Sequence, residues 1–127
     1  MAKQELKTML AEANASIETL PAEAAIGLVD DPGVTFVDVR EVAETLKSGM
    51  AKGAINAPRG FLEFIVDPAG PMHNPVFSPD RRYVLYCGSG GRSALAGKTL
   101  TDMGFANVSH IAGGFGAWQS AGGPLAG

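Results

Sequence analysis

The chain has a single cysteine and two histidines among its 127 residues. One cysteine cannot form a disulfide within the chain or build a cluster of metal-bound thiolates, so we expect a reducing, cytoplasmic environment. No apolar run approaches the ~20 residues that a membrane-spanning helix needs. The N-terminal segment MAKQELKTMLAEANASIE mixes charged and apolar positions without a continuous hydrophobic stretch. It therefore does not fit a secretory signal peptide.

An excess of basic residues is also missing, since the net charge at pH 7 is −3. Proteins that bind nucleic acid or anionic membranes are usually basic, so we expect neither kind of partner. Hydrophobic residues make up 46% and charged residues 18% of the chain, an ordinary balance for a folded domain. This length suits one domain over residues 1–127, with residues 1–15 as an amphipathic helix outside its core. That helix would pack on its own domain or form a dimer contact, and the sequence leaves both open.

Short apolar segments alternate with helical patterns along the chain. Strands are predicted over residues 34–39, 54–57, 83–86 and 108–111. Helices are predicted over residues 4–13, 21–29, 40–48, 60–66, 93–103 and 115–118. This order indicates an α/β domain in which helices cover both faces of a mostly parallel sheet. Residues 67–82 are rich in Pro, Gly and Asn and are predicted to form a long ordered loop whose role is open.

Cys87 stands where a predicted strand ends and a predicted helix begins. Ligands of open α/β sheets bind at the carboxyl ends of the strands. Three of the next four residues are glycines (Gly88, Gly90 and Gly91), which allow backbone N–H groups to turn inward around one point. The helix adds free N–H groups and the positive end of its dipole, and Arg92 adds a permanent cation. The sequence therefore predicts an anion-binding loop that favours a reactive thiolate.

The simpler interpretation is that Cys87 is only a small buried apolar residue, as many single cysteines are. That interpretation leaves the glycines and the arginine at the strand-to-helix junction unexplained. We therefore interpret Cys87 as a nucleophile. Ser89 and Ser93 can add hydroxyl donors to the same sulfur or to an outgoing oxyanion.

The segment YCGSGGRSALAGKTLTDMGF, followed by GGFGAWQSAGGP, is similar to the active-site half of a rhodanese domain. Upstream, FVDVRE (residues 36–41) and GAINAPRG (residues 53–60) resemble the family's other two segments, and the resemblance covers about residues 16–125. It implies a three-layer α/β fold with a five-stranded sheet. It also implies transfer of sulfane sulfur from a donor such as thiosulfate to a thiophilic acceptor such as cyanide. In that family the loop cysteine attacks the outer sulfur, sulfite leaves, and a persulfide remains on the enzyme.

The resemblance therefore implies that Cys87 is the catalytic residue. A persulfide carries its charge on the terminal sulfur, which inward N–H groups can stabilise without a metal or a cofactor. The predicted substrate-binding residues are Gly88, Ser89, Gly90, Gly91, Arg92 and Ser93. Arg92 can neutralise an incoming thiosulfate or brace the loop by bonding its carbonyls, and both roles can hold together.

Two positions depart from the family pattern. The residue after the cysteine is often a cation in the family, and here it is Gly88, which lowers the affinity we expect for thiosulfate. Residues 50–52, Met-Ala-Lys, stand where the family usually has a histidine and a β-branched residue. We expect this second departure to affect packing more than chemistry.

Supporting residues are predicted at the ends of neighbouring strands. Asp38 and Arg40 are interpreted as a structural pair, in which the carboxylate holds loop N–H groups and the arginine. Arg59 is predicted to face the mouth of the site. His73 and His110 have no partners at metal-binding spacing, so we assign no metal. A Cys–His pair is not expected, because the loop already favours the thiolate.

Alternatives use the same cysteine. Cysteine-dependent phosphatases and arsenate reductases have a similar loop with one residue more than the four between Cys87 and Arg92, and the shorter loop fits a single sulfur better. A persulfide carrier or regulatory module would pass its sulfur to a protein partner. The sequence does not separate such a carrier from an enzyme that acts on a small-molecule donor and on a thiol or cyanide acceptor.

Overall fold

The computed structural model describes residues 4–126. Over this range five strands form one sheet in the order β1-β5-β4-β2-β3, and each strand pairs in parallel with its neighbours. The strands are β1 (Glu18–Leu20), β2 (Val34–Asp38), β3 (Ile55–Asn56), β4 (Arg82–Tyr86) and β5 (Asn107–Ile111). The predicted α/β class and the parallel sheet are thereby confirmed.

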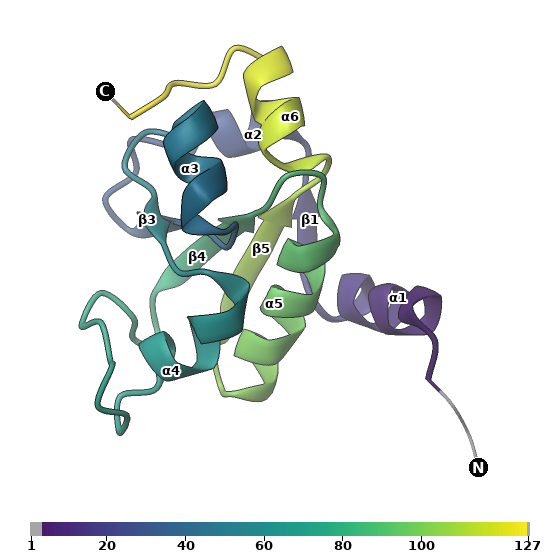
Figure 1. Ribbon diagram of the computed structural model, residues 1–127, viewed down its shortest axis with the longest axis vertical. Helices are drawn as coiled ribbons and strands as arrows, with labels where there is room; N and C mark the ends of the chain where they lie inside the picture. The colour runs from purple at the N-terminus through teal and green to yellow at the C-terminus, as the bar shows by residue number, and fades with distance from the viewer. Residues whose placement is uncertain (1–3, 127) are drawn as a thin grey trace.

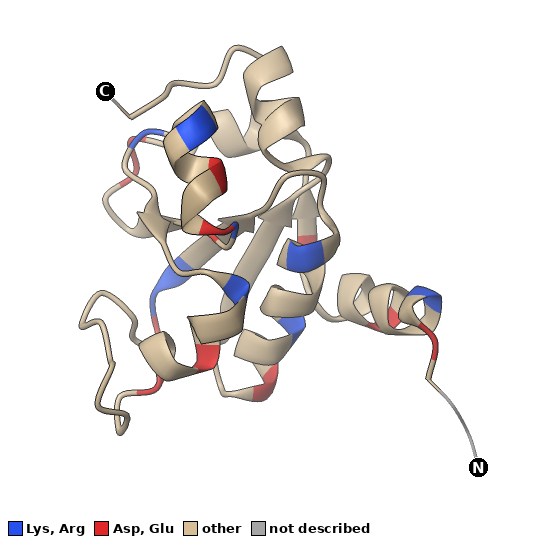
Figure 2. Ribbon diagram, in the orientation of Figure 1, with Lys and Arg blue, Asp and Glu red and all other residues tan. Residues whose placement is uncertain are grey.

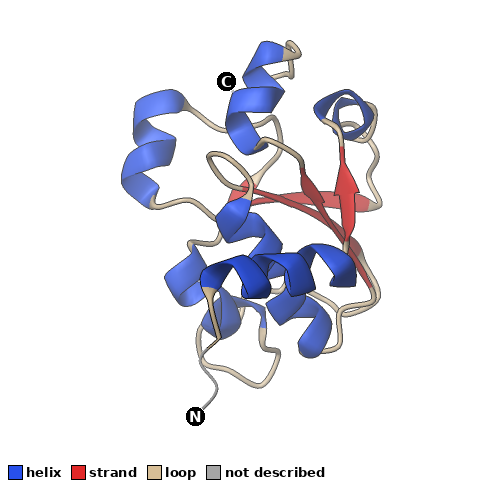
Figure 3. Cartoon of the chain, turned by 90° about the vertical axis from the view of Figure 1, so that its right-hand side faces the viewer, coloured by secondary structure: helices blue, strands red, loops and turns tan. Residues whose placement is uncertain are grey.

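Helices lie on both sides of this sheet (Figures 1 and 3). They are α1 (Leu6–Ser16), α2 (Ala22–Ile26), α3 (Val42–Ser48), the 3₁₀ turn η1 (Arg59–Phe61), α4 (Leu62–Val66), α5 (Gly91–Asp102) and α6 (Gly114–Ser120). One face of the sheet packs against α2 and α6, and the other packs against α4 and α5. Helix α3 follows the carboxyl end of β2. None of the helices in the described range is long and apolar enough to cross a membrane.

The alternation of side chains along β4 explains why two separate cores form. Tyr83 and Leu85 point into the cluster under α4 and α5, whereas Val84 and Tyr86 point into the cluster under α2 and α6. All four side chains are buried, as the apolar run predicts for a central strand. Trp118 of α6 is also fully buried.

Strand β1 is the element that the sequence pattern does not predict. Its three residues include the exposed Glu18 and Thr19, so they form no apolar run. Pairing with β5 holds the strand in place, with Thr19 opposite His110. This pairing brings α1, which directly precedes β1, against α5 at one side of the domain (Figure 1).

The long loop over residues 67–82 is tied to the core by aromatic side chains. Phe77 is buried and stacks on Tyr83 of β4, with ring centroids 5.3 Å apart. The Tyr83 hydroxyl accepts the Ser78 N–H at 2.7 Å and donates to the Val76 carbonyl at 2.9 Å. These contacts give the loop a structural role on the α4 side of the sheet.

Candidate active site

Cys87 directly follows β4, at the carboxyl edge of the sheet and between the ends of β5 and β2. Its side chain is 1% exposed. Its carbonyl accepts the Phe115 N–H at 2.7 Å, which ties the strand end to α6. Gly114 makes this close approach possible, because a Cβ at that position would lie 2.4 Å from the same carbonyl.

The loop after Cys87 turns its N–H groups onto the sulfur. Gly90 adopts a φ of 114°, which favours glycine, and its N–H donates to the Cys87 Sγ at 3.0 Å. The Ser93 N–H, in the first turn of α5, donates to the same sulfur at 3.4 Å, and the Ser93 Oγ lies 3.6 Å from it. The structure therefore brings Gly90 and Ser93 directly onto the sulfur.

These contacts decide the ionisation of the thiol. Burial raises the pKa of Cys87, but hydrogen bonds from the Ser93 hydroxyl and from the N–H groups of Ser93, Gly90 and Ser89 lower it. The result is a pKa below the ordinary value of a cysteine. The loop thus stabilises a thiolate, and the nearby Arg92 guanidinium interacts favourably with that charge, which helps to raise the pKa of Arg92.

We expect the rate of Cys87 alkylation by iodoacetamide to reach half its maximum at a pH clearly below the ~8.5 of a free cysteine. Because the chain has one cysteine, mass spectrometry reports this rate without interference from a second site. An inflection at or above the free-cysteine value would mean that the loop does not stabilise the thiolate.

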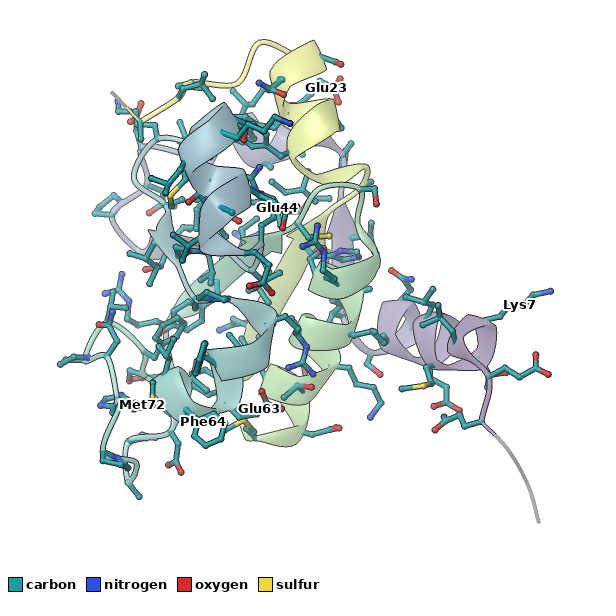
Figure 4. All side chains as sticks on the ribbon, in the orientation of Figure 1. Lys7, Glu23, Glu44, Glu63, Phe64 and Met72 are labelled. Carbon is teal, nitrogen blue, oxygen red and sulfur yellow. The ribbon has the colours of Figure 1, made fainter. Side chains whose placement is uncertain are left out.

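Arg92 makes a two-pronged ion pair with Glu44 of α3, with Nη1–Oε2 and Nη2–Oε1 distances of 2.7 and 3.0 Å. Glu44 lies on the side of α3 that faces the start of α5 (Figure 4). The Arg92 Nη2 would lie 3.3 Å from a Cβ on Gly88, so the glycine leaves room for the guanidinium above the loop. The ion pair ties Arg92 to α3, a contact that the sequence did not predict, and its role toward thiosulfate stays a prediction.

Glu44 was given no role by the sequence. The Arg92 guanidinium and the Glu41 N–H hold the pKa of its carboxyl at about 2, far below its usual range. Its Oε2 accepts that Glu41 N–H at 2.9 Å in a capping box at the start of α3. The Glu-x-x-Glu spacing at a helix start was the available signal, but it points to a cap and not to Arg92.

Asp38 and Arg40 form a buried pair at the end of β2. The Arg40 Nη2 lies 2.7 Å from Asp38 Oδ2, and the Arg40 Nε lies 3.0 Å from Oδ1. The same guanidinium donates to Ser48 and Gly49 and lies 4.3 Å from the centre of the Phe115 ring. This geometry agrees with the structural pair that the sequence indicates, and it anchors α3 and α6 beside the site.

The prediction that Arg59 faces the mouth of the site is wrong. Its Nη1 lies 2.9 Å from Glu63 Oε1 and its Nη2 lies 3.1 Å from Thr99 Oγ1. Pro58 directly precedes η1, which continues into α4. The Arg59 side chain therefore pairs with Glu63, one helical turn later, and also reaches Thr99 on the side of α5. Arg59 therefore fastens α4 to α5 at a distance from the cysteine loop.

The two histidines lie in different settings. His73 is on the 67–82 loop, with its Nε2 3.1 Å from the Phe77 carbonyl oxygen. His110 is buried on β5, with its Nδ1 2.9 Å from Ser93 Oγ. A Cys–His pair was not expected from the sequence, yet Ser93 connects this ring to the Cys87 sulfur. The available signal was a polar residue inside a strand that is otherwise buried.

A surface hollow of about 350 Å³ opens beside the loop. It is lined by residues of the loop, of β1, of β5 and of α1, namely Leu10, Asn14, Thr19, Ser89, Gly90, Gly91, His110, Ala112 and Gly113. A larger hollow of about 540 Å³ lies at the opposite, amino edge of the sheet, around Glu18, Arg82 and Asn107. Of these two hollows, the smaller one is lined by Ser89, Gly90 and Gly91 of the loop that follows Cys87.

Charged side chains of both signs are interspersed over the helices, while the sheet between them carries few (Figure 2). Besides the pairs already described, Lys98 pairs with Asp102 along α5, Lys52 with Asp30, and Arg82 with Glu18. An anion at Cys87 is therefore favoured by the loop N–H groups and by the nearby Arg92, and not by a large basic surface.

Comparison with known proteins gives this site its context. Residues 21–121 match the model of the rhodanese-like domain, and the chain belongs to the rhodanese-like domain family. It is 32% identical over 120 residues to the chloroplastic thiosulfate sulfurtransferase 16 of Arabidopsis thaliana, a match that covers 83% of this chain and 92% of that protein. The family assignment and this relative connect the chain to sulfur transfer.

Solved structures agree with the fold. The polysulfide-sulfur transferase homodimer of Wolinella succinogenes has 30% sequence identity and a TM-score of 0.73, covering 94% of this chain and 85% of that one. A protein of unknown function from Rhodopseudomonas palustris, described as a possible tyrosine phosphatase, has 46% identity and a TM-score of 0.92. That match covers 98% of this chain and 96% of the other.

Proposed function

We propose that this protein is a sulfurtransferase that moves sulfane sulfur from a donor such as thiosulfate to a thiophilic acceptor such as cyanide through a persulfide on Cys87. The observation that carries the proposal is the pair of hydrogen bonds to the buried Cys87 Sγ. The Gly90 N–H donates at 3.0 Å and the Ser93 N–H donates at 3.4 Å. The proposal also places the chain in a reducing, cytoplasmic compartment that keeps its lone thiol free.

The chemistry needs two displacements at sulfur. The Cys87 thiolate attacks the outer sulfur of thiosulfate, a new S–S bond forms, and the bond to the sulfonate sulfur breaks with its electron pair leaving on sulfite. The acceptor then attacks the terminal sulfur of the persulfide, and the S–S electron pair returns to Cys87 as a thiolate. Loop N–H groups that already converge on the sulfur are suited to hold a charge on its neighbour.

A phosphatase fits this loop less well, although one structural relative is described as a possible tyrosine phosphatase. A phosphoryl group needs donors around three oxygens, whereas the N–H groups here meet at a single atom. Arg92, the residue that would clamp an oxyanion, is engaged by both oxygens of Glu44. These two observations favour transfer of a single sulfur.

Treatment with thiosulfate is expected to add the mass of one sulfur atom to the intact protein under non-reducing conditions, and cyanide should remove it. The Cys87→Ser variant is the matched control, because serine keeps the size of the side chain and cannot form a persulfide. The same mass gain in that variant, or no gain in the unmodified protein, would refute the proposal.

The acceptor is tested separately. Rapid formation of thiocyanate from thiosulfate and cyanide would identify a small-molecule enzyme. A stable persulfide with slow turnover would identify a carrier that passes sulfur to a protein. Such a carrier would form the same persulfide on Cys87.

A further inference from the structure

A line of hydrogen bonds leads from the Cys87 sulfur through β5 to the N-terminal helix. The Cys87 Sγ lies 3.6 Å from Ser93 Oγ, which lies 2.9 Å from His110 Nδ1. The other ring nitrogen of His110, Nε2, lies 2.9 Å from the Oδ1 of Asn14 on α1 and 3.1 Å from Thr19 Oγ1 on β1. The side chains of Cys87, Ser93 and His110 are all buried.

The direction of these hydrogen bonds follows from Asn14. Its Nδ2 donates to the Leu10 carbonyl of the same helix at 3.0 Å, which turns its Oδ1 toward the imidazole. Because that oxygen can only accept, the hydrogen of the neutral ring is on Nε2. The Nδ1 of His110 is then an acceptor. The Ser93 hydroxyl has two acceptors within reach, the Gly90 carbonyl at 3.2 Å and this Nδ1 at 2.9 Å, and the shorter contact is the one to the imidazole. Ser93 in turn keeps a lone pair for the Cys87 S–H.

We propose that His110 is a positioning residue that receives, through the Ser93 hydroxyl, the proton that Cys87 releases, and that Asn14 holds its ring for this purpose. The Cys87 S–H proton passes to Ser93 Oγ while the Ser93 proton passes to His110 Nδ1. The products are a thiolate and an imidazolium, so no net charge enters the buried site. The proposal rests on the proposed function, since it supplies the thiolate that attacks the donor and keeps a counter-charge while a persulfide is present.

The surroundings of His110 suit this exchange. Burial lowers the pKa of the imidazole, which favours the neutral ring over the imidazolium while the thiol is neutral. Its partners on α1, β1 and α5 are uncharged, and Leu85 of β4 lies opposite it in the sheet. Cys87 is the titratable group that faces it through Ser93. A negative charge on that sulfur favours the imidazolium, so the two groups titrate as a coupled pair.

The charged side chains on the elements around His110 pair with other side chains or point away from the imidazole. The pairs are Glu12 with Gln4, Glu18 with Ser109 and Arg82, Arg92 with Glu44, and Lys98 with Asp102. Lys7 of α1 points away from the domain (Figure 4). The charge that appears at Cys87 is therefore the one to which His110 responds.

The test uses the pH dependence of Cys87 alkylation in substituted full-length chains. His110→Phe is expected to raise the inflection by about 1 pH unit, because the thiolate loses its counter-charge. His73→Phe changes the chain's other histidine and should leave the profile unchanged. A His110→Phe profile that coincides with that of the unmodified protein would overturn the proposal.

Asn14 gives a second test that does not depend on filling a buried position. Asn14→Asp places a carboxylate against Nε2, which favours the imidazolium and should lower the inflection. Asn14→Leu removes the acceptor and should raise it. Opposite shifts from one position cannot come from a general loss of structure. Shifts in the same direction, or none, would contradict the proposed role.

Nitrogen NMR of the imidazole rings gives an independent measurement, because the chain has only two histidines. His110 is expected to titrate at a lower pH in the Cys87→Ala variant than in the unmodified protein. None of these measurements needs a sulfur donor. If the shifts occur but thiosulfate adds no sulfur, the hydrogen-bond line stands and the proposed function fails. If the persulfide forms without the shifts, the role of His110 fails alone.

Discussion

The Arg40→Met variant is expected to lose about 3–5 kcal/mol of unfolding free energy, which is a large part of the stability of a small domain. Asp38 is fully buried and accepts hydrogen bonds from the Arg40 guanidinium and from the Arg40 backbone N–H. Without the guanidinium, the carboxylate is left with no opposite charge, and the acceptors of Ser48 and Gly49 lose their donor. Because methionine keeps much of the apolar stem of arginine, the loss of unfolding free energy measures mainly the removal of the charged guanidinium.

Urea unfolding followed by circular dichroism measures this effect against an exposed pair in the same chain. Lys52 and Asp30 lie 3.0 Å apart with most of both side chains exposed. Lys52→Met should therefore change the unfolding free energy by less than ~1 kcal/mol. Adding Asp38→Asn to Arg40→Met should recover part of the loss, because no buried charge then remains. Equal losses in Arg40→Met and Lys52→Met would show that the buried pair adds nothing.

The central strands of the fold could be predicted because each carries its own signal. The predicted strands over residues 34–39 and 83–86 are mostly apolar, and the burial of β2 and β4 on both faces of the sheet is what such segments indicate. Strand β1 carries no such signal, since its residues are polar or only partly buried. It exists because β5 offers an unpaired edge, and that information lies in another part of the chain.

The same difference separates the predicted from the missed parts of the site. The loop from Cys87 to Ser93 is continuous in sequence, so its glycines and its place at a strand end could be interpreted together. His110, Asn14 and Glu44 come from β5, α1 and α3, and only the packing of these elements brings them to the loop.

Arg59 shows the converse error. Its position after a predicted strand suggested the carboxyl edge of the sheet, but a side chain follows its own local turn. The Pro58 turn and the ion pair with Glu63 direct it to α5. A residue at the correct edge of a sheet is therefore not necessarily a residue of the site.

Inserting one glycine between Gly90 and Gly91 is expected to lower sulfur transfer by at least 10²–10³-fold, the scale seen when an anion-stabilising donor is lost. The Gly90 N–H would keep its contact with Cys87 Sγ, whereas the N–H and hydroxyl of Ser93 lie beyond the insertion and would move away from the sulfur. The wider loop would also shift Arg92 from Glu44.

A glycine inserted between Pro71 and Met72, both exposed on the 67–82 loop, is the matched control. It lengthens the chain equally and should leave transfer nearly unchanged. Thiocyanate formation measures the rate, and circular dichroism verifies that both variants fold.

The unmodified protein should not hydrolyse an aryl phosphate, because its loop N–H groups converge on one sulfur and not around three oxygens. Hydrolysis that depends on Cys87 would overturn the assignment to sulfur transfer. Unchanged sulfur transfer after the insertion between Gly90 and Gly91 would leave the assignment to sulfur transfer standing. It would refute only the argument from loop geometry, since the persulfide would then form without a tightly closed loop.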